Sequence, residues 1–225
     1  MASKALAVIG VTFYAASAAA SEWNGYLSVG SDYVYRGVSL LDSGPSLDGG
    51  IEGRFGEAFV VGASAARVDR QWAYQQQVSN HLQLDFYGGA DFGCGAYCRA
   101  RVLVSRYAFP GSGARDWFEA TGSVSLFDRG GVSASWSPHG LGSRERTWTF
   151  ESWLQQPLSR NTVFELGYGR VLIEDLDYWY TRIGVSHRIG RFMVDLSAHW
   201  SDHGLRSFAL DDHNRRVVMT VTTGF

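Results

Sequence analysis

Residues 191–201, RFMVDLSAHWS, alternate between apolar and polar side chains along almost their whole length. Val194 and Leu196 fall on one side of an extended chain, whereas Asp195 and Ser197 fall on the other. Successive side chains of a β-strand point to opposite faces, whereas a helix would repeat its apolar positions every three or four residues. This stretch therefore predicts a β-strand with one apolar and one polar face.

The same alternation recurs along the chain in segments separated by turn residues, and no helical period competes with it after the first 20 residues. Such segments, bounded by Gly, Asp, Asn and Ser, are typical of strands. We expect twelve of them, near residues 23–39, 45–55, 58–68, 81–92, 97–109, 117–127, 131–138, 146–157, 162–173, 177–189, 191–202 and 215–225.

The connections between these strands alternate in length. Tight turns are expected at residues 56–57, 94–98, 128–130, 159–161 and 190, and longer polar loops at 68–80, 111–116, 139–145 and 201–214. Bacterial outer-membrane barrels have an even number of strands, with short turns in the periplasm and longer loops outside. The sequence therefore predicts an all-β fold, a transmembrane antiparallel up-and-down β-barrel of about 12 strands with both termini periplasmic.

The first 20 residues have the features of a secretory signal. Lys4 supplies a positive charge, residues 5–20 are almost free of polarity, and the stretch ends in three alanines, Ala18 to Ala20. A transmembrane anchor would be longer and would be followed by a charged stop signal. We expect a signal peptide at 1–20, cleaved before Ser21, and one barrel domain at 21–225 in the outer membrane of a Gram-negative cell.

The composition suits a barrel better than a soluble domain. The chain has 27 Gly, 8 Trp, 11 Tyr and 13 Phe but only 4 Pro, and its mean hydropathy of -0.12 is low because only alternate residues of a barrel strand face lipid. A soluble β-sandwich or small soluble barrel, with the apolar faces inside, would show the same alternation. Aromatic residues cluster near the expected strand ends, where they suit a membrane interface: Trp23, Tyr33, Tyr35, Phe55, Phe59, Phe92, Trp117, Trp136, Trp148, Phe164, Trp179, Trp200 and Phe225.

The last segment, residues 215–225, ends in Phe225, which shares the expected lipid face with Val217, Met219 and Val221. A terminal aromatic on an alternating strand resembles the signal by which the barrel-assembly machinery recognises its substrates. We therefore expect that machinery as a partner, together with outer-membrane lipid and lipopolysaccharide.

The net charge and the two cysteines argue against a nucleic-acid partner and against a metal site. A net charge of -2 with scattered basic residues gives no support for a nucleic-acid partner. Cys94 and Cys98 lie four residues apart, and in an exported chain they could form a disulfide or remain free thiols. We expect no metal site there, because the segment offers too few ligands, and no cofactor.

One motif resembles a known family. Residues 31–39, SDYVYRGVS, are followed by Gly44-Pro45 and Gly49-Gly50, a pattern similar to the opening signature of the proteobacterial Gcw_chp family. Residues 83–89 and 107–111 resemble its later blocks more loosely. The family is exported, has about this length and has no assigned function. The resemblance thus implies architecture and export, but no activity and no catalytic residues.

The polar faces of the strands would line the lumen, where charged side chains could set ion selectivity. The candidate selectivity residues are Asp32, Arg36, Asp48, Glu52, Asp85, Arg101, Glu151, Arg182 and Asp195. Further charged residues on these faces include Arg54, Asp91, Glu119, Glu165 and Arg216.

A 12-stranded barrel is wider than the eight-stranded type that side chains fill, so a passive pore for small hydrophilic solutes is the expected function. The alternative is a closed barrel with a structural, adhesive or surface-binding role, in which the charges only pair with one another. A lipid-modifying enzyme is the third hypothesis. His199 shares its face with Ser197 and Asp195, but residues two apart on a strand point in parallel and seldom form a triad, and no Gly-x-Ser-x-Gly motif is present. We therefore expect no enzymatic activity.

Overall fold

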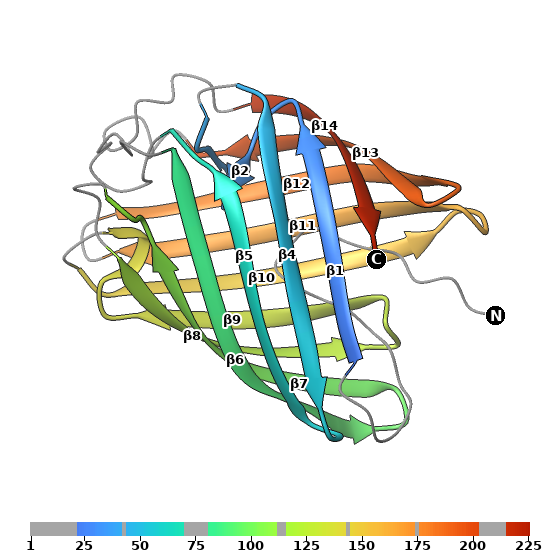
Figure 1. Ribbon diagram of the computed structural model, residues 1–225, viewed down its shortest axis with the longest axis horizontal. Helices are drawn as coiled ribbons and strands as arrows, with labels where there is room; N and C mark the ends of the chain where they lie inside the picture. Colours follow the sequence, from blue (N-terminus) through green and yellow to red (C-terminus); the bar gives the residue numbers. More distant parts are fainter. Residues whose placement is uncertain are drawn as a thin grey trace.

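The computed structural model describes residues 22–41, 44–69, 81–111, 116–142, 145–173, 176–202 and 215–225. Twelve antiparallel strands close into one barrel (Figure 1), and a single 3-10 turn, η1 (Gly140–Gly142), is the other regular element of these residues apart from a short internal hairpin. The barrel strands are β1 (Glu22–Gly30), β4 (Ser46–Phe55), β5 (Phe59–Arg67), β6 (Leu82–Gly95), β7 (Cys98–Ala108), β8 (Trp117–Leu126), β9 (Gly130–Ser137), β10 (Thr147–Pro157), β11 (Thr162–Ile173), β12 (Leu176–Ile189), β13 (Phe192–Ser201) and β14 (Arg215–Gly224).

Each barrel strand pairs with its neighbours in the chain, and the sheet closes where β1 pairs with both β4 and β14. At this seam Gly25 and Phe225 exchange two backbone hydrogen bonds of 2.8 and 3.0 Å. Closure pairs every strand on both sides, so the barrel has no exposed sheet edge. The prediction of a 12-stranded antiparallel up-and-down barrel is confirmed.

The two ends of the barrel differ. Glu22, Phe225 and the turns that follow β4, β6, β8, β10 and β12 lie at one end, which we call the short-turn end. The expected tight turns are confirmed there, and Gly56 and Gly190 take positive φ angles of 62° and 59° in two of them. The opposite end, the long-loop end, carries the longer connections, most of whose residues lie outside those described.

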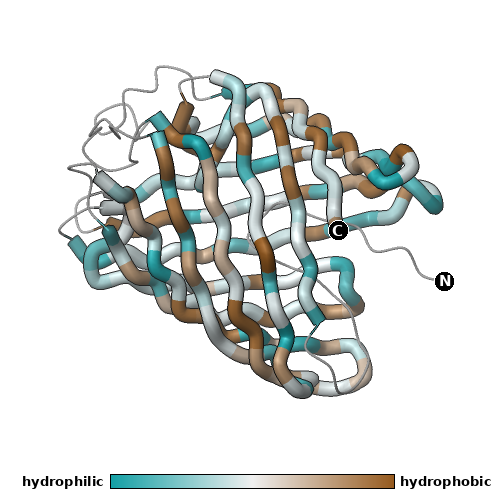
Figure 2. Tube along the Cα trace, in the orientation of Figure 1, coloured by the Kyte–Doolittle hydropathy of each residue, from teal (hydrophilic) through white to brown (hydrophobic). Residues whose placement is uncertain are grey.

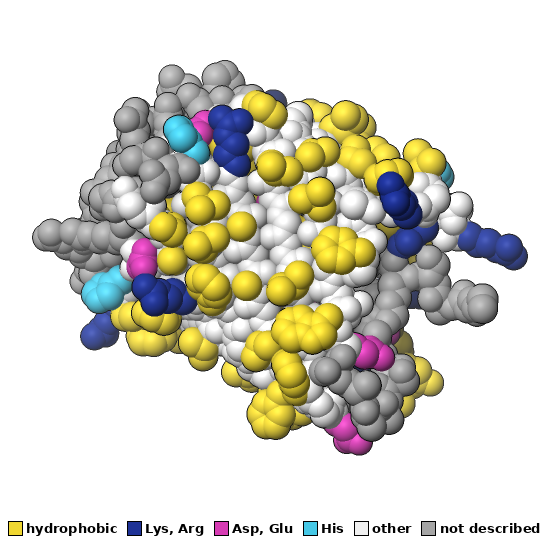
Figure 3. Space-filling view, in the orientation of Figure 1, with side chains coloured by type: hydrophobic (Ala, Val, Ile, Leu, Met, Phe, Trp, Pro, Cys, Tyr) yellow, Lys and Arg dark blue, Asp and Glu magenta, His cyan; other side chains and the backbone are white. Residues whose placement is uncertain are grey.

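The outer surface is apolar and the inner surface polar. Large apolar side chains such as Phe59, Leu196 and Val217 are 67%, 56% and 71% exposed on the outside, whereas Glu52 and Ser28 are each 1% exposed inside. Apolar and polar residues alternate along the strands (Figure 2), and the apolar side chains gather over the middle of the wall (Figure 3). A soluble β-sandwich would have the reverse polarity, so that alternative is wrong. In the described residues, no helix has the length and apolar character needed to cross a membrane.

The first strand is shorter than the sequence predicted. β1 ends at Gly30 rather than at residue 39, and the chain then turns into the barrel. Residues 34–39 form a separate two-stranded hairpin of β2 (Val34–Tyr35) and β3 (Val38–Ser39), which lies behind β4 and β5 in Figure 1. A 17-residue strand would also have exceeded the 9–11 residues that typically span a membrane.

Candidate functional site

The β2–β3 hairpin is built on a two-residue turn. Arg36 and Gly37 connect the strands with φ angles of 49° and 80°. Tight hairpin turns favour positive φ at both central residues, which glycine adopts freely and arginine does not. Gly37 is also closely packed, since a Cβ added there would lie 2.5 Å from the Cβ of Tyr180. Contacts of the hairpin with the barrel wall must therefore hold Arg36 in this conformation.

The tip of the hairpin is bound to two separate parts of the wall. Both terminal nitrogens of Arg36 donate to the Glu119 carboxylate on β8, at 2.7 and 2.9 Å. From β12, the Tyr178 hydroxyl donates to the backbone carbonyl of Arg36 at 3.2 Å. Because β9, β10 and β11 separate β8 from β12 in the sheet, the hairpin reaches across the lumen instead of following one wall.

The base of the hairpin is held by Asp32. Its carboxylate accepts hydrogen bonds from the Ser39 hydroxyl at 2.7 Å and from Arg216 on β14 at 3.1 Å. We call residues 31–41, which lie inside the barrel, the inward segment. The Asp32 side chain thus joins the start and the end of this segment to β14. Buried charges are tolerated when they are paired and hydrogen-bonded in this way.

Apolar and aromatic residues pack the hairpin into the long-loop half of the lumen. The Tyr35 and Tyr107 rings lie 6.2 Å apart, and Tyr107 stacks on Trp117 at 4.7 Å. Burial raises the pKa of the Tyr33 and Tyr35 hydroxyls well above their ordinary value, so both stay neutral. The buried cluster comprises Val38, Leu40, Ala66, Val68, Phe109, Trp117, Val171, Ile173 and Tyr178. The hairpin therefore narrows the lumen with a packed core rather than with a loose loop.

These positions correct part of the aromatic prediction. Tyr33, Tyr35 and Trp117 were expected at the membrane interface, but all three face the interior and contact the hairpin or belong to it. Trp117 is 3% exposed. The reason is that the hairpin brings an apolar surface into the lumen, which aromatic side chains of the wall then cover.

Charged networks line the rest of the lumen. Toward the short-turn end, Arg101 binds Asp91 with two hydrogen bonds of 2.5 and 2.8 Å and approaches Glu52 at 3.4 Å. Arg54 donates to the same Asp91 carboxylate at 2.5 Å. These side chains come from β4, β6 and β7, and because β5 lies between β4 and β6 in the sheet, the Arg54–Asp91 pair crosses the inner surface of β5.

A second network lies on β11 to β13. Arg182 donates to Glu165 and, at 2.8 Å, to Asp195, while the Ser186 hydroxyl donates to Asp195 at 3.0 Å. Such charge-assisted bonds are stronger than neutral ones and orient the side chains involved.

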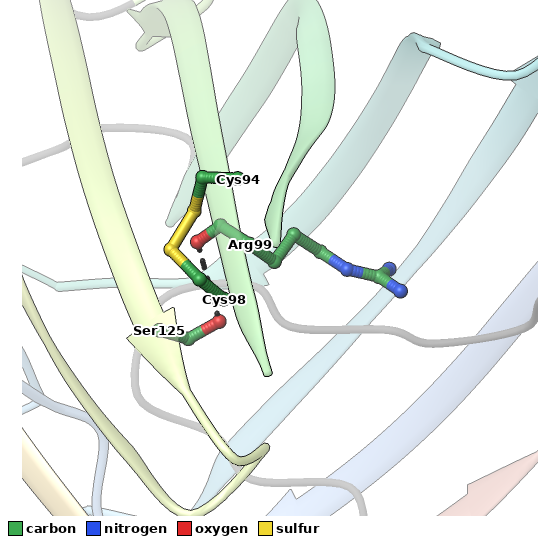
Figure 4. Close-up of a disulfide and its surroundings, with 4 residues drawn as sticks. All are labelled: Cys94, Cys98, Arg99 and Ser125. Atoms are coloured by element: carbon green, nitrogen blue, oxygen red, sulfur yellow. Dashed lines mark hydrogen bonds between the residues drawn. A yellow bond between two sulfur atoms is a disulfide. The ribbon is translucent and has the colours of Figure 1, made fainter. Parts of the chain in front are cut away.

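The short-turn end opens into a cavity of about 1060 Å³. Charged side chains such as Arg54, Asp91 and Arg99 line it, together with turn residues. Cys94 and Cys98 form a disulfide with Cα atoms 5.0 Å apart at its edge, and Figure 4 shows the Arg99 side chain pointing away from that bond. The lumen is therefore accessible from this end as far as the first charged network.

Residues 14–220 match the family described as "Bacterial protein of unknown function (Gcw_chp)". The chain belongs to this family. No curated protein matches the Gcw_chp chain.

Solved porins share the fold of this Gcw_chp protein. The KdgM porin aligns with a TM-score of 0.52 at 8% identity, over 91% of this chain and 98% of the porin. The NanC porin gives 0.55 at 5% identity over 89% and 97%, and the COG4313 outer membrane channel from Pseudomonas putida F1 gives 0.52 at 10% identity over 93% and 97%. At such low identity the likeness concerns the fold, which is that of outer-membrane porins.

All nine candidate selectivity residues of the Gcw_chp chain lie inside the barrel, although Asp32 and Arg36 lie on the inward segment and not on a strand. Asp32, Arg36, Glu52, Arg101, Arg182 and Asp195 take part in ion pairs. Asp48, Asp85 and Glu151 have hydrogen bonds from hydroxyl or amide groups instead. The role of Tyr178 in binding the hairpin tip was not foreseen, although the alternation of β12 had placed this residue on the inner face.

The histidines of the Gcw_chp barrel form no outward Ser–His contact among the described residues. His199 Nε2 and Ser197 Oγ lie 3.1 Å apart, but both face the lumen. On the outside, His187 contacts the Thr162 hydroxyl at 2.9 Å near the short-turn end. No group of three or more potential metal ligands occurs within the described part of the chain.

Proposed function

We propose that the protein is a channel of the Gram-negative outer membrane for small hydrophilic solutes, and that the β2–β3 hairpin forms its constriction. The observation that carries the proposal is the polarity of the closed barrel, apolar outside and charged inside. We call the apolar side chains on the outer surface the apolar belt. A soluble barrel would not expose such a belt, and a lumen that only had to be filled by side chains would not require so many charged groups.

The porin fold supports this function, since KdgM and NanC are porins and KdgM was solved in complex with oligogalacturonate. Oligogalacturonate is a hydrophilic solute, and we propose this class of cargo for the chain. Export through a signal peptide at 1–20 and assembly through the C-terminal strand ending in Phe225 complete the proposal. In it, the short-turn end faces the periplasm and the belt contacts lipid and lipopolysaccharide.

A closed barrel with a structural or surface-binding role is the second candidate. The observation that favours it is the set of contacts that holds the hairpin in the lumen: it is hydrogen-bonded to β8, β12 and β14 and packed in an apolar cluster. The two candidates differ in whether a continuous water path passes the hairpin.

Planar-bilayer recording of the refolded mature protein separates them. We expect discrete conductance steps from the wild type. Replacing Arg36 with Met removes the bidentate pair with Glu119, so the tip should loosen, and Glu119 should remain as an unpaired charge. Single-channel conductance should rise, and preference for cations should increase.

The matched control is Arg170→Met, because Arg170 pairs with Asp177 on the outer surface and should leave conductance unchanged. Silent bilayers from protein that is folded, as judged by heat-modifiable mobility on a gel, would contradict the channel and favour the closed barrel.

A further inference from the structure

The arginines around the hairpin are neutralised. Arg36 is engaged by Glu119, Arg216 by Asp32, and Arg182 by both Glu165 and Asp195. Arg54 and Arg101 share Asp91 and Glu52 in the same way. A guanidinium bound to a carboxylate has little positive charge to offer an anion that enters the lumen.

Three inward carboxylates differ from this pattern, because no described arginine forms an ion pair with them. Asp85 accepts hydrogen bonds from Ser64 at 3.2 Å and Gln83 at 2.9 Å. Asp48 is hydrogen-bonded by Tyr26 and Ser28. Hydroxyl and amide donors orient a carboxylate but leave its charge uncompensated.

Glu151 completes the set. It accepts hydrogen bonds from Ser133 at 3.3 Å and Tyr180 at 2.5 Å. Arg36 acts on Glu151 only through space, since both of its terminal nitrogens bond to Glu119. Among the described residues, Glu151 therefore has neutral hydrogen-bond donors and no bonded cation.

The three carboxylates surround the hairpin. Asp48 on β4 and Asp85 on β6 flank β5, and their charges act on the hydroxyl of Tyr33 in the inward segment. Glu151 lies on β10, which β7, β8 and β9 separate from β6 in the barrel wall. Two further inward arginines, Arg99 and Arg188, lie at the short-turn end, away from the hairpin. A solute that passes the constriction thus meets uncompensated negative charge on two sides.

We propose that the lumen selects cations and neutral polar solutes over anions, and that Asp48, Asp85 and Glu151 set this preference at the hairpin. The inference rests on the proposed channel function and adds the class of solute. It is specific to these side chains, because the other charged groups described around the hairpin are paired.

The test is the reversal potential in a planar bilayer with a gradient of KCl at pH 8, where carboxylates are ionised. The wild type should pass K⁺ in preference to Cl⁻. Asp48→Asn, Asp85→Asn and Glu151→Gln should each lower the permeability ratio by about fivefold, because a unit charge about 8 Å away in water favours the cation and disfavours the anion by about twofold each. Asp177→Asn makes the same chemical change on the outer surface and should have no effect.

Swelling of proteoliposomes provides a second readout that needs no variant. Glucosamine and glucose should enter faster than glucuronate, which has the same ring size but a negative charge. A conducting wild type that prefers Cl⁻, or glucuronate entry as fast as that of glucose, would overturn the inference and leave the channel intact. A silent bilayer with no swelling would overturn the channel itself, and the inference with it.

Discussion

Arg36 and Gly37 show how two residues position the whole constriction. Arg36 has a φ of 49°, a conformation that costs an L-residue about 1–2 kcal/mol, and the contacts with Glu119 and Tyr178 offset this cost. Arginine at the turn thus combines an unfavourable backbone with a favourable side-chain contact, while Gly37 allows the close approach of Tyr180.

Replacing Gly37 with Ala should destabilise the protein by about 2 kcal/mol or more, because the new methyl group combines a positive φ with a clash against Tyr180. Gly56→Ala is the matched control, since Gly56 has a φ of 62° but no atom within 4 Å of an added Cβ. It should cost only about 1 kcal/mol. Urea unfolding in lipid vesicles, followed by tryptophan fluorescence, measures both. Equal losses would mean that the hairpin does not pack as described.

Single residues were only partly predictable from the sequence. Alternation places Arg182 and Asp195 inside the barrel, because each side chain of a barrel strand points either into the lumen or to the outer surface. It could not place the partners of Arg36, since Glu119 and Tyr178 lie 83 and 142 positions away in the chain. Alternation is also the same in one long strand and in two short ones, so the turn at Arg36 had only Gly37 as a local signal.

At the scale of elements, turns were more predictable than the course of the inward segment. Glycine with positive φ ends β4 and β12 locally, whereas the hairpin is held by contacts that form only when the barrel closes. The β6–β7 turn is intermediate in how well the sequence predicts it. Its two cysteines are visible in the sequence, but the bond between them depends on the register of the two strands. That register shifts by a residue between Gly93 and Gly95.

Replacing Cys94 and Cys98 with Ser should lower stability by at most about 2 kcal/mol, because closing so short a loop removes little chain entropy from the unfolded state. The barrel should still fold, since the strand pairing of β6 and β7 extends well beyond the turn. Mass spectrometry after alkylation, with and without reductant, tests the bond first. Alkylation of both thiols in unreduced protein isolated from membranes would contradict the disulfide.

At the scale of the whole molecule, the position of the apolar belt determines where a charge can be tolerated. Leu196 lies near the middle of β13 on the outer surface, opposite Met219 of β14, and both are more than half exposed. In water an exposed leucine can be replaced at little cost, but in a bilayer an arginine at mid-depth costs about 2–4 kcal/mol. Leu196→Arg should therefore reduce the free energy of unfolding in lipid vesicles by that amount.

Tyr97→Arg is the matched control for this belt experiment. Tyr97 is 68% exposed in the β6–β7 turn, at the edge of the short-turn end, where the cost of an arginine falls to about 0–1 kcal/mol. The difference between the two variants measures depth in the membrane, because both add the same side chain to an exposed site. Equal, small losses would mean that the surface faces water, and the belt would then require another partner. A loss confined to Leu196→Arg would place the middle of the barrel wall in the hydrocarbon layer.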